Sequence, residues 1–140
     1  MPSVSVVLVA ATSLHAGFQL TVTLLVYPAL AAVGRPDFAR AHARHSRTIV
    51  PLVGVVYGAV LVTASGAVLA TPSSAPVWVS ALSSAVALAT TAFRAAPLHA
   101  RLGRLGPEPA LLAALLRADR VRTAATVVAA AAAIAAALVG

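Results

Sequence analysis

Four histidines are the side chains best suited to chemistry in a sequence that is otherwise poor in ionisable groups. His42 and His45 are three residues apart, so on a helix they would share one face. His15 lies in the apolar stretch before them, and His99 lies at the end of a later apolar stretch. Neutral imidazole is a common ligand for copper, iron, zinc and nickel. The pattern therefore predicts one metal site made of His15, His42, His45 and His99. His15 lies about 18 Å along its helix from Tyr27, so whether it reaches the other three histidines stays open.

The remaining composition narrows the choice of metal. The chain has no cysteine, which excludes thiolate ligands, and only three acidic residues, which are too few for a carboxylate-bridged di-iron centre. A histidine-dominated site favours copper, with iron as the alternative and zinc less favoured. Because each histidine must be neutral to bind a metal, the metal affinity is expected to fall at low pH.

Asp119 and Arg122 are the candidates for catalytic roles beside the histidines. They are three residues apart, so an ion pair on one helix face is expected. Asp119 would orient a ligand or shuttle a proton, and Arg122 would hold Asp119 in place. Gln19 shares a helix face with His15 and is expected, together with Tyr27, to line the substrate pocket. For each polar residue taken singly, a structural role such as hydrogen bonding between helices stays open.

The elements that would position these residues are transmembrane helices. The chain has 140 residues, of which 61% are hydrophobic and 9% charged, and its mean hydropathy is +0.98. Apolar runs of about 18 or more residues are typical of membrane-spanning helices. Four such spans are predicted at about 4–28, 46–70, 77–96 and 121–139, in one transmembrane domain over 1–140. The predicted fold class is therefore all-α, an integral membrane four-helix bundle.

Local signals predict where the helices begin and end. Asp37 suits an N-cap, so the second helix is expected to begin near Phe38. Pro51 predicts a kink where that helix enters the apolar zone. A Gly/Pro-rich link is expected over 101–109, and the segment Pro109–Arg117 is typical of a short amphipathic helix before the fourth span.

The charge distribution predicts the orientation in the membrane. All ten basic residues are arginines, the net charge is +7, and the arginines lie in or beside the first and third connections. The positive-inside rule then places both of these connections in the cytoplasm and both termini outside. Membrane topology accounts for the basic charge, so no nucleic-acid partner is expected. The lysine-free, alanine-rich composition suggests a bacterial inner membrane, and the small-residue helix faces are compatible with a homo-oligomer.

Short motifs along nearly the whole chain resemble the small four-helix DUF1772 proteins, also called the anthrone-oxygenase-like family. The matching motifs are His15-x-Gly17-x-Gln19, Tyr27-Pro28, Phe38 with His42-x2-His45 and Pro51, Pro97-x-His99-x2-Leu102, and Asp119-x2-Arg122-Thr123. Where the family commonly has Asn-Trp, this chain has Asp119-Arg120. The resemblance implies oxygenation of hydrophobic, often aromatic or polyketide, metabolites, or oxidation at nitrogen, by a membrane-embedded enzyme of natural-product biosynthesis.

Two functions from different classes are compatible with these features. The first is a membrane-embedded, metal-dependent oxygenase or oxidase that uses dioxygen on a hydrophobic metabolite entering from the lipid bilayer. The second is a non-catalytic accessory subunit or small transporter that binds haem between histidines, which an intense Soret band would reveal. A proton-coupled transporter normally has an acidic residue inside a span, and the interiors of the predicted spans contain none.

Overall fold

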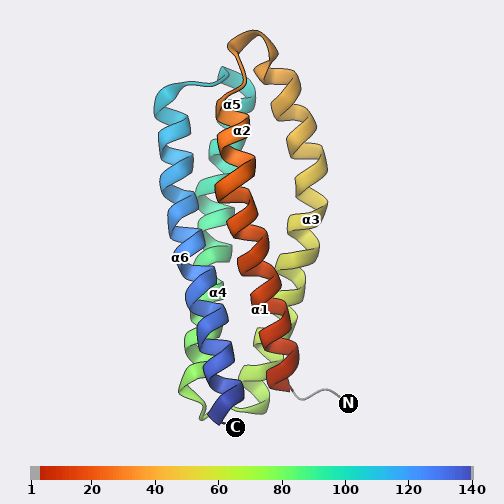
Figure 1. Ribbon diagram of the computed structural model, residues 1–140, viewed down its shortest axis with the longest axis vertical. Helices are drawn as coiled ribbons and strands as arrows, with labels where there is room; N and C mark the ends of the chain where they lie inside the picture. Colours follow the sequence, from red (N-terminus) through yellow and green to blue (C-terminus); the bar gives the residue numbers. More distant parts are fainter. Residues whose placement is uncertain (1–3, 140) are drawn as a thin grey trace.

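A computed structural model describes residues 4–139 as four long helical rods packed side by side in one bundle (Figure 1). The first rod is α1 (Val4–Thr21), η1 (Val22–Val26) and α2 (Tyr27–Ala31), and the second is α3 (Arg35–Ala70). The third is α4 (Ala75–Thr90), η2 (Thr91–Ala95) and α5 (Ala96–Leu105), and the fourth is α6 (Pro109–Val139). Each rod is long and apolar enough to cross a membrane, so the predicted four-helix bundle is confirmed.

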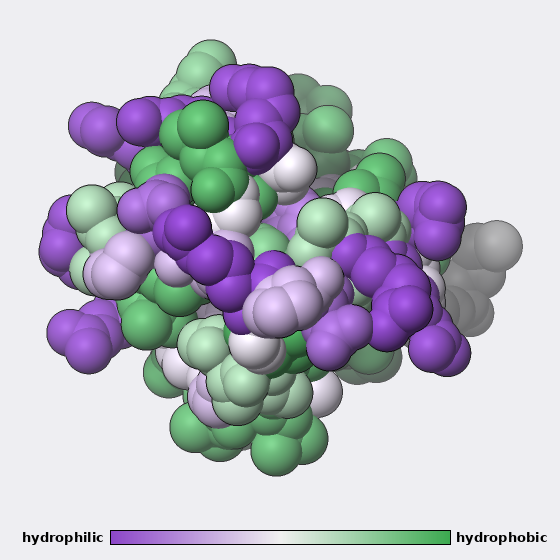
Figure 2. Space-filling view, turned by 90° about the horizontal axis from the view of Figure 1, so that it is seen from above, coloured by the Kyte–Doolittle hydropathy of each residue, from purple (hydrophilic) through white to green (hydrophobic). Residues whose placement is uncertain are grey.

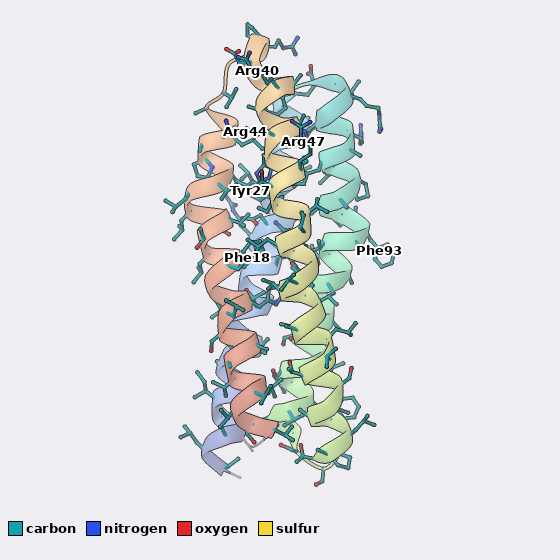
Figure 3. All side chains as sticks on the ribbon, turned by 90° about the vertical axis from the view of Figure 1, so that its right-hand side faces the viewer. Phe18, Tyr27, Arg40, Arg44, Arg47 and Phe93 are labelled. Carbon is teal, nitrogen blue, oxygen red and sulfur yellow. The ribbon has the colours of Figure 1, made fainter. Side chains whose placement is uncertain are left out.

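The two ends of the bundle differ in charge. The upper end in Figure 1 carries the connections 32–34 and 106–108, and the lower end carries the start of α1, the end of α6 and the turn 71–74. Arg40, Arg44 and Arg47 lie in the upper half in Figure 3, and hydrophilic residues surround the upper end in Figure 2. Among residues 4–139, the lower half has no Asp, Glu or Arg. The bundle therefore has one strongly basic end.

The core changes in character between the two ends. Towards the lower end it is built mainly of small residues, and Ala67 and Ala133 are 1% and 0% exposed. Small side chains let helices approach closely. Towards the basic end the buried side chains are larger, as with Phe38, Leu102 and Leu115. The polar residues singled out from the sequence lie mostly in this second region.

Two π-helical turns interrupt the first and third rods. In η1 the Tyr27 N–H bonds the Val22 carbonyl, and in η2 the Ala96 N–H bonds the Thr91 carbonyl. Each turn ends two residues before a proline, Pro28 or Pro97, which cannot donate a backbone hydrogen bond and clashes with the preceding turn of a regular helix. A π turn takes up one extra residue and rotates everything after it by about 100°.

The second rod begins three residues earlier than expected. Gly34, in an extended conformation, is the N-cap of α3, and Asp37 lies inside the first turn, where it pairs with Arg40. The N-cap assigned to Asp37 was therefore wrong, because Pro36 is well suited to the first turn of a helix and moves the start upstream. Pro51 lies inside α3, which continues through it to Ala70.

The region before the last span also differs from the prediction. The third rod continues as α5 to Leu105, so the link covers only 106–108 rather than 101–109. The segment Pro109–Arg117 is not a separate amphipathic helix but the beginning of α6. The physical reason is that no glycine or proline follows Pro109 within α6, so nothing ends the helix between its amphipathic and apolar parts.

Candidate functional site

Three of the four histidines lie together towards the basic end. His42 Nε2 of α3 is 3.2 Å from His99 Nδ1 of α5. The ring of His45, also on α3, lies 5.9 Å from the His99 ring between centroids. Phe38 stacks on His42 at 5.6 Å, with the two ring planes 24° apart. His42 and His45 therefore share one face of α3, as their spacing predicted, and this face contacts His99 of the third rod.

A hydrogen-bonded chain, part-buried at His99 and buried at Arg122 and Asp119, continues from this histidine pair across the bundle. His99 Nε2 is 3.1 Å from the Tyr27 hydroxyl, which accepts a hydrogen bond from Arg122 Nη2 at 2.8 Å. Arg122 Nη2 also donates to Asp119 Oδ1 at 2.8 Å, and Gln19 Nε2 donates to the same oxygen at 2.6 Å. The residues come from all four rods, so the chain of contacts depends on the assembled bundle.

Asp119 and Arg122 form the ion pair that their spacing predicts, and both are almost fully buried. The expectation that Asp119 orients a histidine directly is not met. Its carboxylate contacts Gln19 and Arg122, and it reaches His99 only through Arg122 and Tyr27. Asp119 therefore fixes the position of the Arg122 guanidinium, and the guanidinium fixes the tyrosine hydroxyl.

His15 lies apart from the other three histidines. It is fully buried, and its ring contacts the Tyr57 ring edge-on at 4.4 Å. At about 1.5 Å per residue it is about 18 Å along the helix from Tyr27, the hydrogen-bond partner of His99. Neither ring nitrogen has a hydrogen-bond partner among the described residues. The four predicted ligands are therefore not brought to one point.

The histidine geometry can be compared with the demands of a metal ion. Within residues 4–139, no three His, Cys, Asp or Glu side chains are arranged to hold one. The 3.2 Å between His42 Nε2 and His99 Nδ1 does suit two ligands of one ion, because bonds of about 2.0 Å at tetrahedral angles separate two nitrogens by about 3.3 Å. Two donors fit a metal, and the described residues do not complete the predicted centre.

A cavity of about 560 Å³ lies beside these residues. Most of its wall is apolar, and one part of the wall is polar and contains the hydrogen-bonded chain. In Figure 3, Tyr27 and Phe18 lie between α1 and α3, with Tyr27 nearer the basic end. The lining residues used below are Phe18, Gln19, Tyr27, His42, His45, Val50, Thr91, His99, Gly103 and Arg122. Gln19 and Tyr27 thus lie where the sequence predicted a substrate pocket.

Two polar atoms in the cavity wall are buried without a partner in the described part of the chain. They are Gln19 Oε1 and Arg122 Nε. The Asp119 carboxylate accepts from the Gln19 amide nitrogen, so the amide oxygen must face the other way. An unpaired buried polar group costs about 1–3 kcal/mol, so a bound molecule that supplies a donor and an acceptor would gain from both atoms.

Thr91, Gly103 and Phe18 are among the residues of the cavity wall that the sequence did not point to. Thr91 bonds the Tyr57 hydroxyl at 2.8 Å and so links the cavity to the neighbourhood of His15. Gly103 lies beside His42, where an added Cβ would be 3.5 Å from Cε1 and 3.6 Å from Nδ1. The four-residue spacing of His99 and Gly103 was a signal for a shared face, whereas Phe18 gave none.

The comparisons with known proteins assign no function to this chain, so its function has to be argued from the geometry of the site. The residues of the short motifs that line the cavity are Gln19, Tyr27, His42, His45, His99 and Arg122. No protein-family model, curated protein or solved structure matches this chain.

Proposed function

We propose that the protein is a membrane-embedded oxygenase or oxidase that uses dioxygen to oxidise a hydrophobic metabolite. The observation that carries the proposal is the hydrogen-bonded chain from Arg122 through Tyr27 and His99 to His42, in the wall of an otherwise apolar cavity. Asp119 and Arg122 at one end of this chain are 1% and 6% exposed, and ionisable groups buried beside a cavity are candidates for a functional site. The resemblance to the anthrone-oxygenase-like family points to the same class of reaction.

The proposed setting is a bacterial inner membrane, with the basic end in the cytoplasm. The connections 32–34 and 106–108 would then be cytoplasmic and both termini outside, because the arginines on the helix ends beside these connections favour the cytoplasmic side. The proposed partners are a hydrophobic small molecule and the lipid around the bundle.

The histidine pair and Tyr27 can move a proton without leaving a net charge behind. In one arrangement, His42 Nε2–H donates to His99 Nδ1 and His99 Nε2–H donates to the Tyr27 oxygen, which leaves His42 Nδ1 bare. In the other, the tyrosine hydroxyl donates to His99, His99 donates to His42, and His42 Nδ1 carries the proton. A proton taken up at His42 Nδ1 is therefore matched by one released from the Tyr27 hydroxyl.

The relay fits oxidation of an activated methylene group by dioxygen. The methylene carbon becomes a carbonyl carbon with one oxygen atom of dioxygen, and the second atom leaves as water with the two hydrogens of the methylene. The reaction therefore needs no further reductant. His42 Nδ1 takes one of these protons, and Tyr27 returns a proton to the oxygen that leaves as water. The guanidinium of Arg122 stabilises negative charge that develops on the tyrosine oxygen.

Copper, with iron as the alternative, remains a predicted cofactor. When bound, the metal would supply activation of dioxygen. His42 Nε2 and His99 Nδ1 are the two donors whose spacing suits it, and His45 is the nearest further imidazole. Because the relay uses the same two nitrogens, a metal held by them would exclude the relay, and the metal content of the active protein distinguishes these two forms of the proposal.

Metal bound by the wild type is expected to be lost in His42→Ala and retained in His15→Ala. The reason is that His42 faces His99, whereas His15 contacts Tyr57. Elemental mass spectrometry of protein purified in mild detergent and incubated with copper or iron measures this, and the expected loss in His42→Ala is roughly tenfold or more. Equal loss in both variants would require His15 to reach the other histidines. A wild type that binds neither metal would contradict the predicted cofactor.

The oxidation itself can be tested with anthrone, a tricyclic ketone with one activated methylene group, as the probe. The purified protein is expected to consume one dioxygen per anthrone and to form anthraquinone, above the rate of spontaneous oxidation. An oxygen electrode measures the dioxygen consumed, and liquid chromatography measures the anthraquinone formed. Rates equal to those of a His42→Ala/His99→Ala variant would overturn the proposal. They would favour the accessory-subunit or transporter alternative, including its haem-binding form.

Gly103→Ala tests whether His42 Nδ1 is the atom that takes the proton. The added methyl group would make ordinary van der Waals contact with the His42 ring, so the fold is expected to be kept. It would partly cover Nδ1, and we expect turnover to fall by about tenfold with an unchanged unfolding temperature. Gly58→Ala, on α3 with open space around it, is the matched control. Unchanged turnover in Gly103→Ala would exclude Nδ1 as the proton acceptor.

A further inference from the structure

The three acidic residues of the chain are all engaged by nearby arginines. Asp37 pairs with Arg40, Glu108 with Arg35, and Asp119 with Arg122. The chain has ten arginines and no other carboxylate side chain that could balance them. The remaining seven arginines therefore depend on anions from outside the protein for any counter-charge.

Three of these seven arginines line one surface groove of about 620 Å³. Arg94 lies on η2, Arg101 on α5 and Arg117 on α6, so two of the rods contribute. The groove shares no lining residue with the histidine cavity. Its apolar side includes Phe93, which is 77% exposed and points away from the bundle in Figure 3, and Val121, which is 50% exposed.

The groove lies at the height expected for lipid headgroups. From Ala75 to Arg94 the third rod rises about 28 Å, and from Val139 back to Val121 the last helix rises about 27 Å. The hydrocarbon core of a bilayer is about 30 Å thick. If the lower end of the bundle lies at one face of the membrane, Arg94 and Arg117 lie about 28 Å and about 33 Å above it, at the opposite headgroup layer, and Arg101 lies about 39 Å above it, at the outer edge of that layer. Phe93 and Val121 then lie beside the first part of the acyl chains.

We propose that this groove binds the headgroup phosphate of an anionic phospholipid. Arginine holds phosphate through paired, charge-assisted hydrogen bonds, and basic pockets between transmembrane helices are known sites for acidic lipids. The phosphate relieves the repulsion between three guanidinium groups that no carboxylate of this chain balances. Exposed apolar side chains beside the groove favour a lipid over a free phosphate ion, because they offer contact to acyl chains.

Membrane orientation alone does not account for the groove. The positive-inside rule requires only that arginines lie on the cytoplasmic side, wherever they point. It does not require arginines from two rods to line the same groove. A matched triple variant separates the two explanations, because Arg44, Arg47 and Arg104 also lie at the basic end and also have no carboxylate partner.

The test compares lipid binding by two variants with the same loss of charge. Wild type, Arg94→Gln/Arg101→Gln/Arg117→Gln and Arg44→Gln/Arg47→Gln/Arg104→Gln are purified in dodecyl maltoside. Each is titrated with dioleoyl phosphatidylglycerol or dioleoyl phosphatidylcholine. Native mass spectrometry counts the bound lipids. We expect wild type to retain phosphatidylglycerol, the groove variant to bind it about 100-fold more weakly, and the control variant to differ by no more than about threefold.

Three results would overturn the proposal. The first is an equal weakening of phosphatidylglycerol binding in the two triple variants. The second is an equal affinity of the wild type for phosphatidylcholine and phosphatidylglycerol. The third is a rise in unfolding temperature with inorganic phosphate that equals the rise with phosphatidylglycerol. Circular dichroism establishes that each variant is folded. If the groove variant does not fold, the corresponding triple lysine variants take its place. Lysine keeps the charge but loses the paired hydrogen bonds, so the groove lysine variant is expected to bind several-fold more weakly than its control.

Discussion

Replacing His99 with alanine is expected to lower anthrone turnover by about 10²–10⁴-fold, the usual contribution of a general acid or base. His99 is the only described residue that contacts both His42 and Tyr27 by hydrogen bonds, so its loss separates the proton acceptor from the proton donor. Dioxygen consumption with anthrone as the probe measures the effect. The spontaneous rate in detergent without protein is the baseline for all variants.

Tyr27→Phe removes one hydroxyl group from the same chain and is expected to have an effect of similar size. The matched control is Tyr57→Phe, which removes a hydroxyl bonded to Thr91 outside the chain from Arg122 to His42. Wild-type turnover in His99→Ala or in Tyr27→Phe would contradict the relay. A similar loss in all three variants would indicate a general effect on packing instead.

Asp119→Ala is expected to destabilise the folded protein by about 3–5 kcal/mol. Arg122 is 6% exposed, and Asp119 supplies its only carboxylate partner within residues 4–139, so the substitution leaves a buried cation without a counter-charge. It also removes the acceptor for the Gln19 amide. The free energy of unfolding, measured by denaturant titration in mixed detergent micelles, is the relevant quantity.

The double variant Asp119→Ala/Arg122→Met removes the stranded charge together with its partner. Its free energy of unfolding is expected to lie above that of Asp119→Ala, because well-packed apolar replacement of a buried ion pair is often neutral. Asp37→Ala is the surface control, since its pair with Arg40 is exposed and such pairs contribute little. A double variant less stable than Asp119→Ala would show that the charge pair is not the source of the effect.

The features that the sequence predicted well are those that depend on one helix at a time. The four spans follow from apolar runs, and the pair of Asp119 and Arg122 follows from a three-residue spacing. His42 and His45 likewise share a face because of their spacing. Their meeting with His99 depended on the expectation that the connections at one end converge, and the described structure meets it.

The features that the sequence did not predict depend on how far along the bundle a residue lies and on how its helix is rotated about its own axis. His15 was grouped with the other histidines by residue type, although the length of helix between it and Tyr27 keeps it near Tyr57. The π turns η1 and η2 change the rotation of the segments that carry Tyr27 and His99. Regular helical periodicity cannot anticipate such a change, so the direct contact of Tyr27 with both Arg122 and His99 was not foreseen.

The wall of the histidine cavity includes Val50, which is 64% exposed on an apolar stretch of α3. A substrate that passes Val50 comes from the hydrocarbon phase, so the quantity that sets the rate is its mole fraction in the lipid. Adding lipid or detergent at constant total substrate dilutes the substrate within that phase and is therefore expected to slow the proposed oxidation. An apparent KM expressed in moles per litre of buffer would then change with the amount of lipid in the assay. An apparent KM expressed as a mole fraction in the lipid would stay constant.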